Sequence, residues 1–202
     1  TLLAGTADQA ILYRIHADGR AQALQDFDGN EIRAIVRARD AIYVAVNAFE
    51  RGGDSGNGGH AVKNHKPAPG LSPASGAQPR GEQVKAHAGV FRLDADGRLE
   101  QVLSLGEGYL TTLALGGDGH VYAGSGAQGK VYRISPDRNV ALALDLPERQ
   151  VLSMVMGTHG LVVGTGDAGA VFRTQSASSG DFSYVSKVFD ADSLARWGLL
   201  RW

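Results

Sequence analysis

Three histidines and an aspartate near one polar stretch of the chain have side chains that can bind metal ions. Asp54, His60 and His65 lie within a Gly- and Pro-rich stretch, and His87 lies at its end. Imidazole and carboxylate groups are common ligands of zinc. Their spacing matches no compact zinc motif, and no regular strand is expected to hold them, so we predict no metal site here. His60, His65 and the neighbouring Lys66 are instead candidates for contacts with a binding partner.

An arginine recurs at one position of a repeated segment, each time beside an aromatic residue. The arginines are Arg14, Arg92, Arg133 and Arg173, and their aromatic neighbours are Tyr13, Phe91, Tyr132 and Phe172. A row of guanidinium groups could bind an anionic ligand. We favour a structural role, in which the stem is buried and the guanidinium pairs with carbonyls or with an acid of the adjacent sheet. The aromatic side chains should point to the opposite face and pack in the core.

Aspartate-glycine pairs recur between apolar runs, at Asp18-Gly19, Asp96-Gly97 and Asp118-Gly119. None of them belongs to the dense series of carboxylates that a calcium loop requires. Glycine adopts the positive φ that tight hairpin turns need. We therefore predict turns rather than calcium sites, and we assign neither catalytic residues nor a cofactor.

Composition excludes several classes of protein. The 202 residues include 20 basic and 21 acidic side chains, which gives a net charge of −1, so general attraction to nucleic acid is unsupported. There is no cysteine, which excludes disulfides and thiol nucleophiles. No apolar run approaches the roughly 20 residues that span a bilayer. The 28 glycines lie mostly at reversals between short apolar runs, which is typical of an all-β protein.

These short apolar runs predict a repeating series of strands. The first cycle has strands at 2–7, 10–17, 21–27 and 32–38, and later strands are expected at 42–47, 89–93, 99–105, 110–115, 120–134 (two), 140–146, 151–156, 161–174 (two) and 182–189. Four strands per cycle and a period of about 40 residues are the pattern of a β-propeller. One such sheet cannot bury both of its faces, so we expect antiparallel four-stranded blades that stack on one another.

Counted from the innermost strand, the chain holds about four blades, the first without its innermost strand. The segment 197–202, with Trp197 and Trp202, could supply that strand and close a ring of four. Blades of this length more often form larger rings, of about six to eight, and we favour such a ring. Residues 1–190 are thus predicted to be propeller blades, and 191–202 the ring closure or the start of a following module.

Residues 48–86 interrupt the cycle inside one blade. They are rich in glycine and contain four prolines, at positions 67, 69, 73 and 79. Such a composition predicts a long loop between two strands. A loop inserted in a hairpin projects from one rim of a propeller, where binding residues are often found.

The recurring unit resembles the β-propeller repeat proteins of the WD, NHL and quinoprotein-like kinds. Its parts are Gly124-Ser125-Gly126 followed by Val131-Tyr132-Arg133, and Gly164-Thr165-Gly166 followed by Val171-Phe172-Arg173. The Trp-Asp and Asn-His-Leu signatures of two of these kinds are missing. The tail 184–202 is similar to a junction in secreted bacterial propellers that precedes a β-sandwich module, which implies a bacterial, extracytoplasmic protein.

Two functions fit this resemblance. The one we favour is a non-enzymatic scaffold that binds a protein or glycan partner through rim loops, with Trp197 and Trp202 as further contacts and with open blade edges available for oligomerisation. The alternative is a metal-dependent propeller hydrolase or lactonase, because such enzymes place acids at the channel ends of several blades. Glu31, Glu107 and Glu148 each precede an innermost strand, but acids are also ordinary turn residues.

Overall fold

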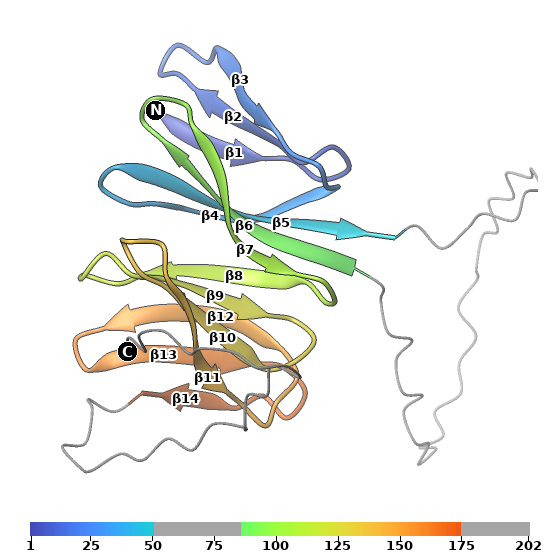
Figure 1. Cartoon of the computed structure of the whole chain (residues 1–202), viewed down its shortest axis with the longest axis vertical. Coiled ribbons are helices and arrows are strands. Elements are labelled where there is room, and N and C mark those ends of the chain that lie inside the picture. The colour runs from blue at the N-terminus through green and yellow to red at the C-terminus, as the bar shows by residue number, and fades with distance from the viewer. Residues whose placement is uncertain (51–85, 175–202) are drawn as a thin grey trace, which may run out of the picture.

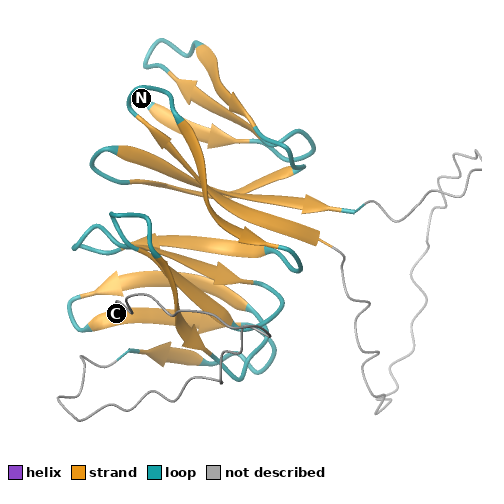
Figure 2. Cartoon of the chain, in the orientation of Figure 1, coloured by secondary structure: helices purple, strands orange, loops and turns teal. Residues whose placement is uncertain are grey.

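The computed structural model describes residues 1–50 and 86–174, which form antiparallel sheets throughout (Figures 1 and 2). The first sheet consists of β1 (Leu2–Gly5), β2 (Ile11–Ile15) and β3 (Ala21–Asp26). The second sheet consists of β4 (Glu31–Arg37), β5 (Ala41–Phe49), β6 (Ala86–Asp94) and β7 (Leu99–Leu105). In both sheets each strand pairs with the next one along the chain.

The other two sheets repeat this order. The third consists of β8 (Leu110–Leu115), β9 (Val121–Ser125), β10 (Lys130–Ile134) and β11 (Val140–Asp145). The fourth consists of β12 (Val151–Gly157), β13 (Gly160–Thr165) and β14 (Val171–Arg173). The predicted all-β fold of meandering blades is confirmed, including the three-stranded first blade. The strand predicted at 182–189 lies outside the described residues.

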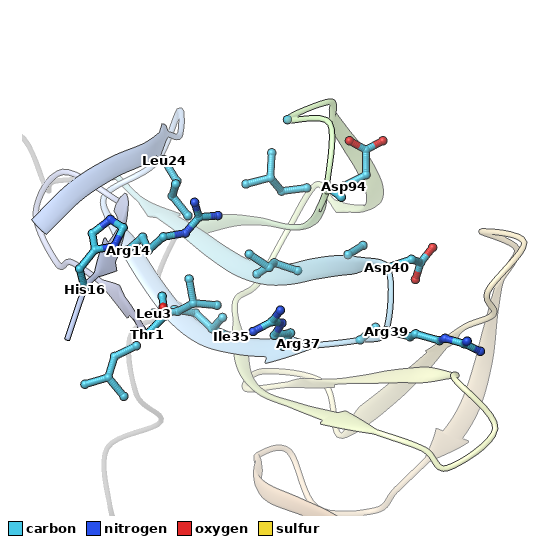
Figure 3. Close-up of a pocket in the computed structure, with 17 residues that line it drawn as sticks. Thr1, Leu3, Arg14, His16, Leu24, Ile35, Arg37, Arg39, Asp40 and Asp94 are labelled. Carbon is cyan, nitrogen blue, oxygen red and sulfur yellow. The ribbon is translucent and has the colours of Figure 1, made fainter.

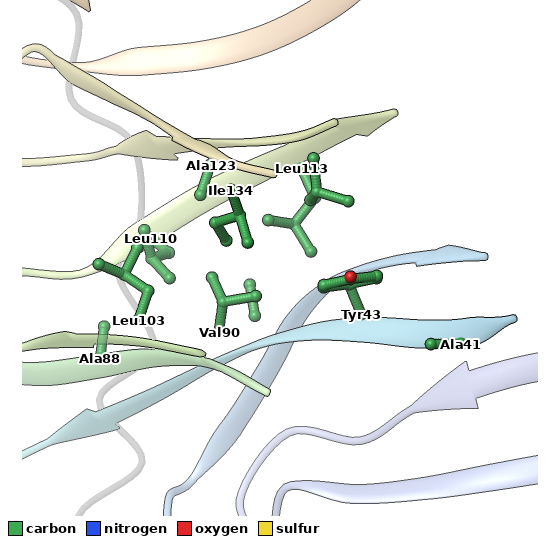
Figure 4. Packing of buried hydrophobic residues seen from close by; sticks show 11 residues of the cluster. Ala41, Tyr43, Ala88, Val90, Leu103, Leu110, Leu113, Ala123 and Ile134 are labelled. Atoms are coloured by element: carbon green, nitrogen blue, oxygen red, sulfur yellow. The ribbon is translucent and has the colours of Figure 1, made fainter. Parts of the chain in front are cut away.

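The four sheets stack face to face as propeller blades do (Figure 1). The innermost strands β4, β8 and β12 contact one another in that order. Apolar clusters fill the spaces between successive sheets: Leu12 and Val46 between the first and second, Val90 and Ile134 between the second and third (Figure 4), and Val163 with its neighbours between the third and fourth. Burial of each sheet face against the next supplies the hydrophobic stabilisation that one sheet alone lacks.

The strands that flank the insertion are longer than predicted. β5 continues to Phe49 and β6 begins at Ala86, and the register pairs these two residues. Residues 48, 49 and 86 were expected in the loop and lie in strands instead. His87 also lies in β6. The two segments stay hydrogen-bonded as antiparallel neighbours beyond the predicted strand ends, and this continued pairing extends both strands.

The Asp-Gly turns are confirmed by their backbone angles. Gly19, Gly97 and Gly119 have φ of 84°, 82° and 84°, the left-handed region that favours glycine. An aspartate side chain helps to close each of these turns, and in the turn of Gly97 it is that of Asp94, which accepts the N–H groups of Asp96 and Arg98. In the other two turns the aspartate before the glycine accepts a backbone N–H: Asp18 accepts from Arg20 at 3.1 Å and Asp118 accepts from His120 at 3.2 Å.

The recurring arginines match the predicted role only in part. Arg92 is largely buried, and its Nη2 lies 2.9 Å from Asp40 Oδ2 while its Nη1 lies 3.7 Å from Asp94 Oδ2. Both acids belong to the same sheet as Arg92, not to the adjacent one, because Arg92 lies near the end of β6 beside the turn that carries Asp40. Arg133 and Arg173 are exposed.

The aromatic residues next to these arginines take the predicted place. Phe91, Tyr132 and Phe172 are half-buried and pack against the apolar clusters. The Phe91 ring lies 5.1 Å from that of Phe27, across the space between the first two sheets. Alternation along the strand therefore holds for these three positions. Among residues 1–50 and 86–174 there is no helix long and apolar enough to cross a membrane.

Candidate functional site

One end of the blade stack carries both the insertion and the connections that lead into the innermost strands. The register places Glu31 of β4 beside Asn47 of β5, Leu110 beside Ser125, and Val151 beside Thr165. The start of each innermost strand thus lies next to the end of the following strand. We call this end, with residues 28–31, 47–50, 86–87, 106–110, 125–129, 146–150 and 165–170, the insertion rim.

Buried hydroxyl groups close the hairpins of the third and fourth blades at this rim. Ser125 Oγ accepts hydrogen bonds from the backbone N–H groups of Ala127 and Gln128, at 3.4 and 3.1 Å. Thr165 Oγ1 donates to the carbonyl of Ala170 at 3.0 Å. Small hydroxyl side chains commonly bond to the backbone of their own turn. The repeated Gly-Ser-Gly and Gly-Thr-Gly segments are therefore turn structures of the blade.

Asn47 occupies the same position in the second blade but bonds to the neighbouring blade. Its Nδ2 donates to the Leu110 carbonyl and its Oδ1 accepts from the Leu110 N–H, both at 2.9 Å. Nδ2 also lies 2.9 Å from Glu31 Oε2. Asn47 is fully buried. One side chain thus satisfies both backbone groups at the start of β8 and joins the second blade to the third.

Side-chain and backbone contacts fasten both strands from which the insertion emerges. Asn30 Nδ2 donates to the Phe49 carbonyl at 2.9 Å, and the Phe49 N–H donates to Asn30 Oδ1 at 3.0 Å. The Gly108 N–H donates to the Ala86 carbonyl at 2.9 Å. His87 Nδ1 lies 2.8 Å from the carbonyl oxygen of Gly106. The base of the insertion is therefore fixed to the preceding and following connections of its own blade.

Tyr109 connects three blades across the rim. Its ring lies 5.8 Å from that of Phe49 in a tilted arrangement, and its hydroxyl accepts a hydrogen bond from Gln150 Nε2 at 3.2 Å. A side chain at Gly126 would overlap the Tyr109 ring, so the absence of a Cβ there allows this position. The rim thus combines aromatic, amide and carboxylate groups on a surface held by the sheets.

The three glutamates of the alternative function all lie at this rim, and two of them bond to neighbouring residues. Glu31 accepts from Asn47 and lies 3.5 Å from Arg33 Nη1. Glu148 Oε2 accepts from the Ala168 N–H at 3.3 Å, and Glu107 is exposed. Within the described part of the chain, no three His, Asp or Glu residues are grouped so that they could hold a metal ion.

An ion pair at the rim gives a titration that can be measured. Arg149 Nη2 lies 3.1 Å from Asp167 Oδ1, and the hydrogen bond from the Arg149 side chain is the main reason that the pKa of Asp167 lies below its usual value of 3.8. Because the pKa of Asp167 is lower in the folded than in the unfolded chain, its ionised form stabilises the fold at pH values above the unfolded pKa. This contribution is lost as the pH falls through the folded pKa.

We expect Arg149→Ala to raise the pKa of Asp167 towards 3.8 in a carboxyl-carbon NMR titration. Asp18, which bonds to Arg20 at the far end, should titrate as before, and an unchanged Asp167 would contradict the pairing.

Part of this site is predictable from the sequence. Glu31, Glu107 and Glu148 precede innermost strands as expected, whereas no local pattern points to Asn30, Asn47 or Tyr109. The only available signal for Asn47 was an asparagine at a repeat position that elsewhere holds serine or threonine. His60, His65, Lys66, Trp197 and Trp202 lie outside the described residues.

Comparisons with known proteins give structural likeness only. No protein-family model matches the sequence, and no curated protein does. Selenomethionine-substituted virginiamycin B lyase from Staphylococcus aureus is similar with a TM-score of 0.37 and 12% identity, over 88% of this chain and 70% of that one. A catalytically inactive virginiamycin B lyase from the same organism, with Quinupristin, gives 0.36 and 13% over 83% and 64%, and a streptogramin B lyase gives 0.35 and 12% over 84% and 63%. The chain thus spans roughly two thirds of the length of these distantly similar structures, and the similarity concerns the arrangement of the strands.

Proposed function

We propose that the chain is a non-enzymatic β-propeller scaffold that binds a protein or glycan partner at the insertion rim. The supporting observation is that both strand ends flanking the insertion are hydrogen-bonded, Phe49 to Asn30 and Ala86 to Gly108. Binding residues are commonly carried by loops on a rigid framework. The extracytoplasmic location that the sequence resemblance implies belongs to the same proposal.

The groups at the rim suit such a partner. The Phe49 and Tyr109 rings lie against each other, and Gln150, Arg149 and Glu148 follow on the next connection. Aromatic rings and arginine are enriched where proteins meet their partners. Aromatic faces beside amide and carboxylate groups also suit sugar rings, which present apolar faces and hydroxyls.

Removal of residues 51–85 is the direct test. Glu50 would be joined to Ala86 through an Asn-Gly turn, which suits a two-residue hairpin connection. We expect the circular dichroism spectrum and melting temperature to stay close to those of the whole chain, because the contacts of Asn30 and Gly108 remain. Binding to a printed glycan array, or capture of one defined protein in a pull-down from secreted proteins, should be lost.

A matched control is available at the opposite end of the blades. Asn139 lies in the turn between β10 and β11, where it is exposed and bonds within the turn. Asn139→Ala should bind the array and the captured protein as the parent chain does. Retention of the same partners after deletion of 51–85 would refute the proposal.

A further inference from the structure

A cleft opens between the first and second blades at the end opposite to the insertion rim. It has a volume of about 740 Å³ and is bounded by the starts of β1 and β5, the ends of β2 and β4, Leu24 of β3, and the turn after β6 (Figure 3). Sites for small molecules usually measure about 300–1,000 Å³. The packed cluster around Leu12 and Phe27 fills the same space between these blades nearer the rim.

Positive charge predominates in this cleft. Arg14, His16, Arg37 and Arg39 line it, from both of the facing sheets (Figure 3). Among the described residues, none of the three arginines has an ion-pair partner, whereas Arg20, Arg33, Arg92, Arg138 and Arg149 each pair with a carboxylate. The net charge of the whole chain is −1, so this concentration of arginine is local.

The two carboxylates of the cleft are already engaged. Asp40 lies 2.9 Å and Asp94 lies 3.7 Å from the guanidinium of Arg92. Asp94 Oδ1 also accepts the backbone N–H groups of Asp96 and Arg98. These acids therefore balance the charge of Arg92 and accept N–H groups of the turn. The positive charge of Arg14 and Arg37 is left for another anion.

The rest of the lining is apolar. Leu3, Leu24, Ile35 and Ile42 are partly buried against the cluster between the two blades, and Leu93 is buried. Ile35 and Arg37 share one face of β4, so an apolar patch and a guanidinium lie side by side on the same strand. A ligand in this cleft would meet cations at one part of its surface and aliphatic side chains at another.

We propose that this cleft binds a small amphipathic anion, whose carboxylate, sulfate or phosphate group contacts Arg14 and Arg37. Guanidinium groups suit such oxyanions because their N–H donors form parallel pairs of hydrogen bonds. The aliphatic part of the ligand covers Leu24, Ile35 and Ile42. This site is independent of the proposed function, because it lies at the other end of the blades and uses none of the residues of the insertion rim.

Three probes separate the parts of this proposal. Decanoate carries both an anion and an aliphatic chain, decanol carries the chain alone, and sulfate carries the anion alone. By isothermal titration calorimetry with the whole chain, decanoate should bind at least about tenfold more tightly than either. Equal binding of decanol would refute the role of the arginines, and equal binding of sulfate would refute the apolar half of the site.

Paired variants locate the site. Arg14→Gln with Arg37→Gln should weaken decanoate binding at least about tenfold. Arg133→Gln with Arg173→Gln removes the same charge from exposed positions of the other blades and should change binding little. An equal loss in both pairs would refute the proposal.

Two further measurements keep the test decisive. If the first pair fails to fold, backbone NMR shifts of the parent chain with decanoate must concentrate at 14–16, 35–42 and 93–97, and shifts elsewhere would overturn the assignment. The chain without 51–85 should bind decanoate normally, so failure of the rim proposal and failure of this one are distinguishable.

Discussion

Asn47→Ala should lower the free energy of unfolding by about 3 kcal/mol, because it leaves the buried N–H and C=O of Leu110 without partners. Each unsatisfied buried polar group costs about 1–3 kcal/mol, and the cavity left by the amide adds to this. The loss is measured by urea unfolding, followed by circular dichroism. Asn139→Ala, in an exposed turn, should change the free energy by no more than about 0.5 kcal/mol.

A second substitution at the same position tests the direction of the hydrogen bonds. Asn47→Asp keeps the acceptor for the Leu110 N–H but replaces the donor that faces the Leu110 carbonyl and Glu31. The new carboxyl would be buried beside another acid, so its pKa should rise above the unfolded value. Its protonated form can donate, and stability should therefore be greatest at low pH and fall as the pH rises through the folded pKa. A loss below about 1 kcal/mol for Asn47→Ala, or a pH-independent Asn47→Asp variant, would contradict this account.

The strands could be predicted because their signals are local. Alternating apolar residues and Asp-Gly pairs involve residues that are close together in the sequence. Gly19, Gly97 and Gly119 take the backbone angles that their turns require. The innermost strands could also be predicted, because the strand pattern repeats. A second copy of the pattern shows which strand begins each blade. The confirmed stacking follows from the need to cover both faces of each sheet.

The site depends on contacts between residues far apart in the chain, which a single sequence does not reveal. Asn47 and Leu110 are 63 positions apart and belong to different blades. Arg14 and Arg37 line one cleft because the first two sheets face each other in the fold. The repeat pattern predicts carbonyls or an acid of the adjacent blade as the partners of Arg92. It does not reveal Asp40, which the turn of the same sheet brings within 2.9 Å.

Gly129→Ala should be among the most damaging small substitutions, with a loss of about 3 kcal/mol or more in the free energy of unfolding. Gly129 has a φ of 66°, a region that costs other residues about 1 kcal/mol. A Cβ there would also overlap the Glu148 carbonyl oxygen and lie 2.6 Å from that of Leu146. Backbone atoms cannot move aside alone, because the Gly129 N–H bonds to the Arg149 carbonyl and its C=O accepts from the Leu146 N–H.

Gly19→Ala isolates the contribution of the backbone angle. Gly19 has a φ of 84° and nothing within 4 Å of the position of a Cβ, so it should lose only about 1 kcal/mol. Equal losses for the two variants in urea unfolding would show that crowding at Gly129 has no effect. The crowded connection carries Glu148, Arg149 and Gln150 into the rim, so Gly129→Ala should also weaken partner binding under conditions where it remains folded. Decanoate binding at the opposite end should persist in the same sample, because the cleft between the first two blades shares no residue with this connection.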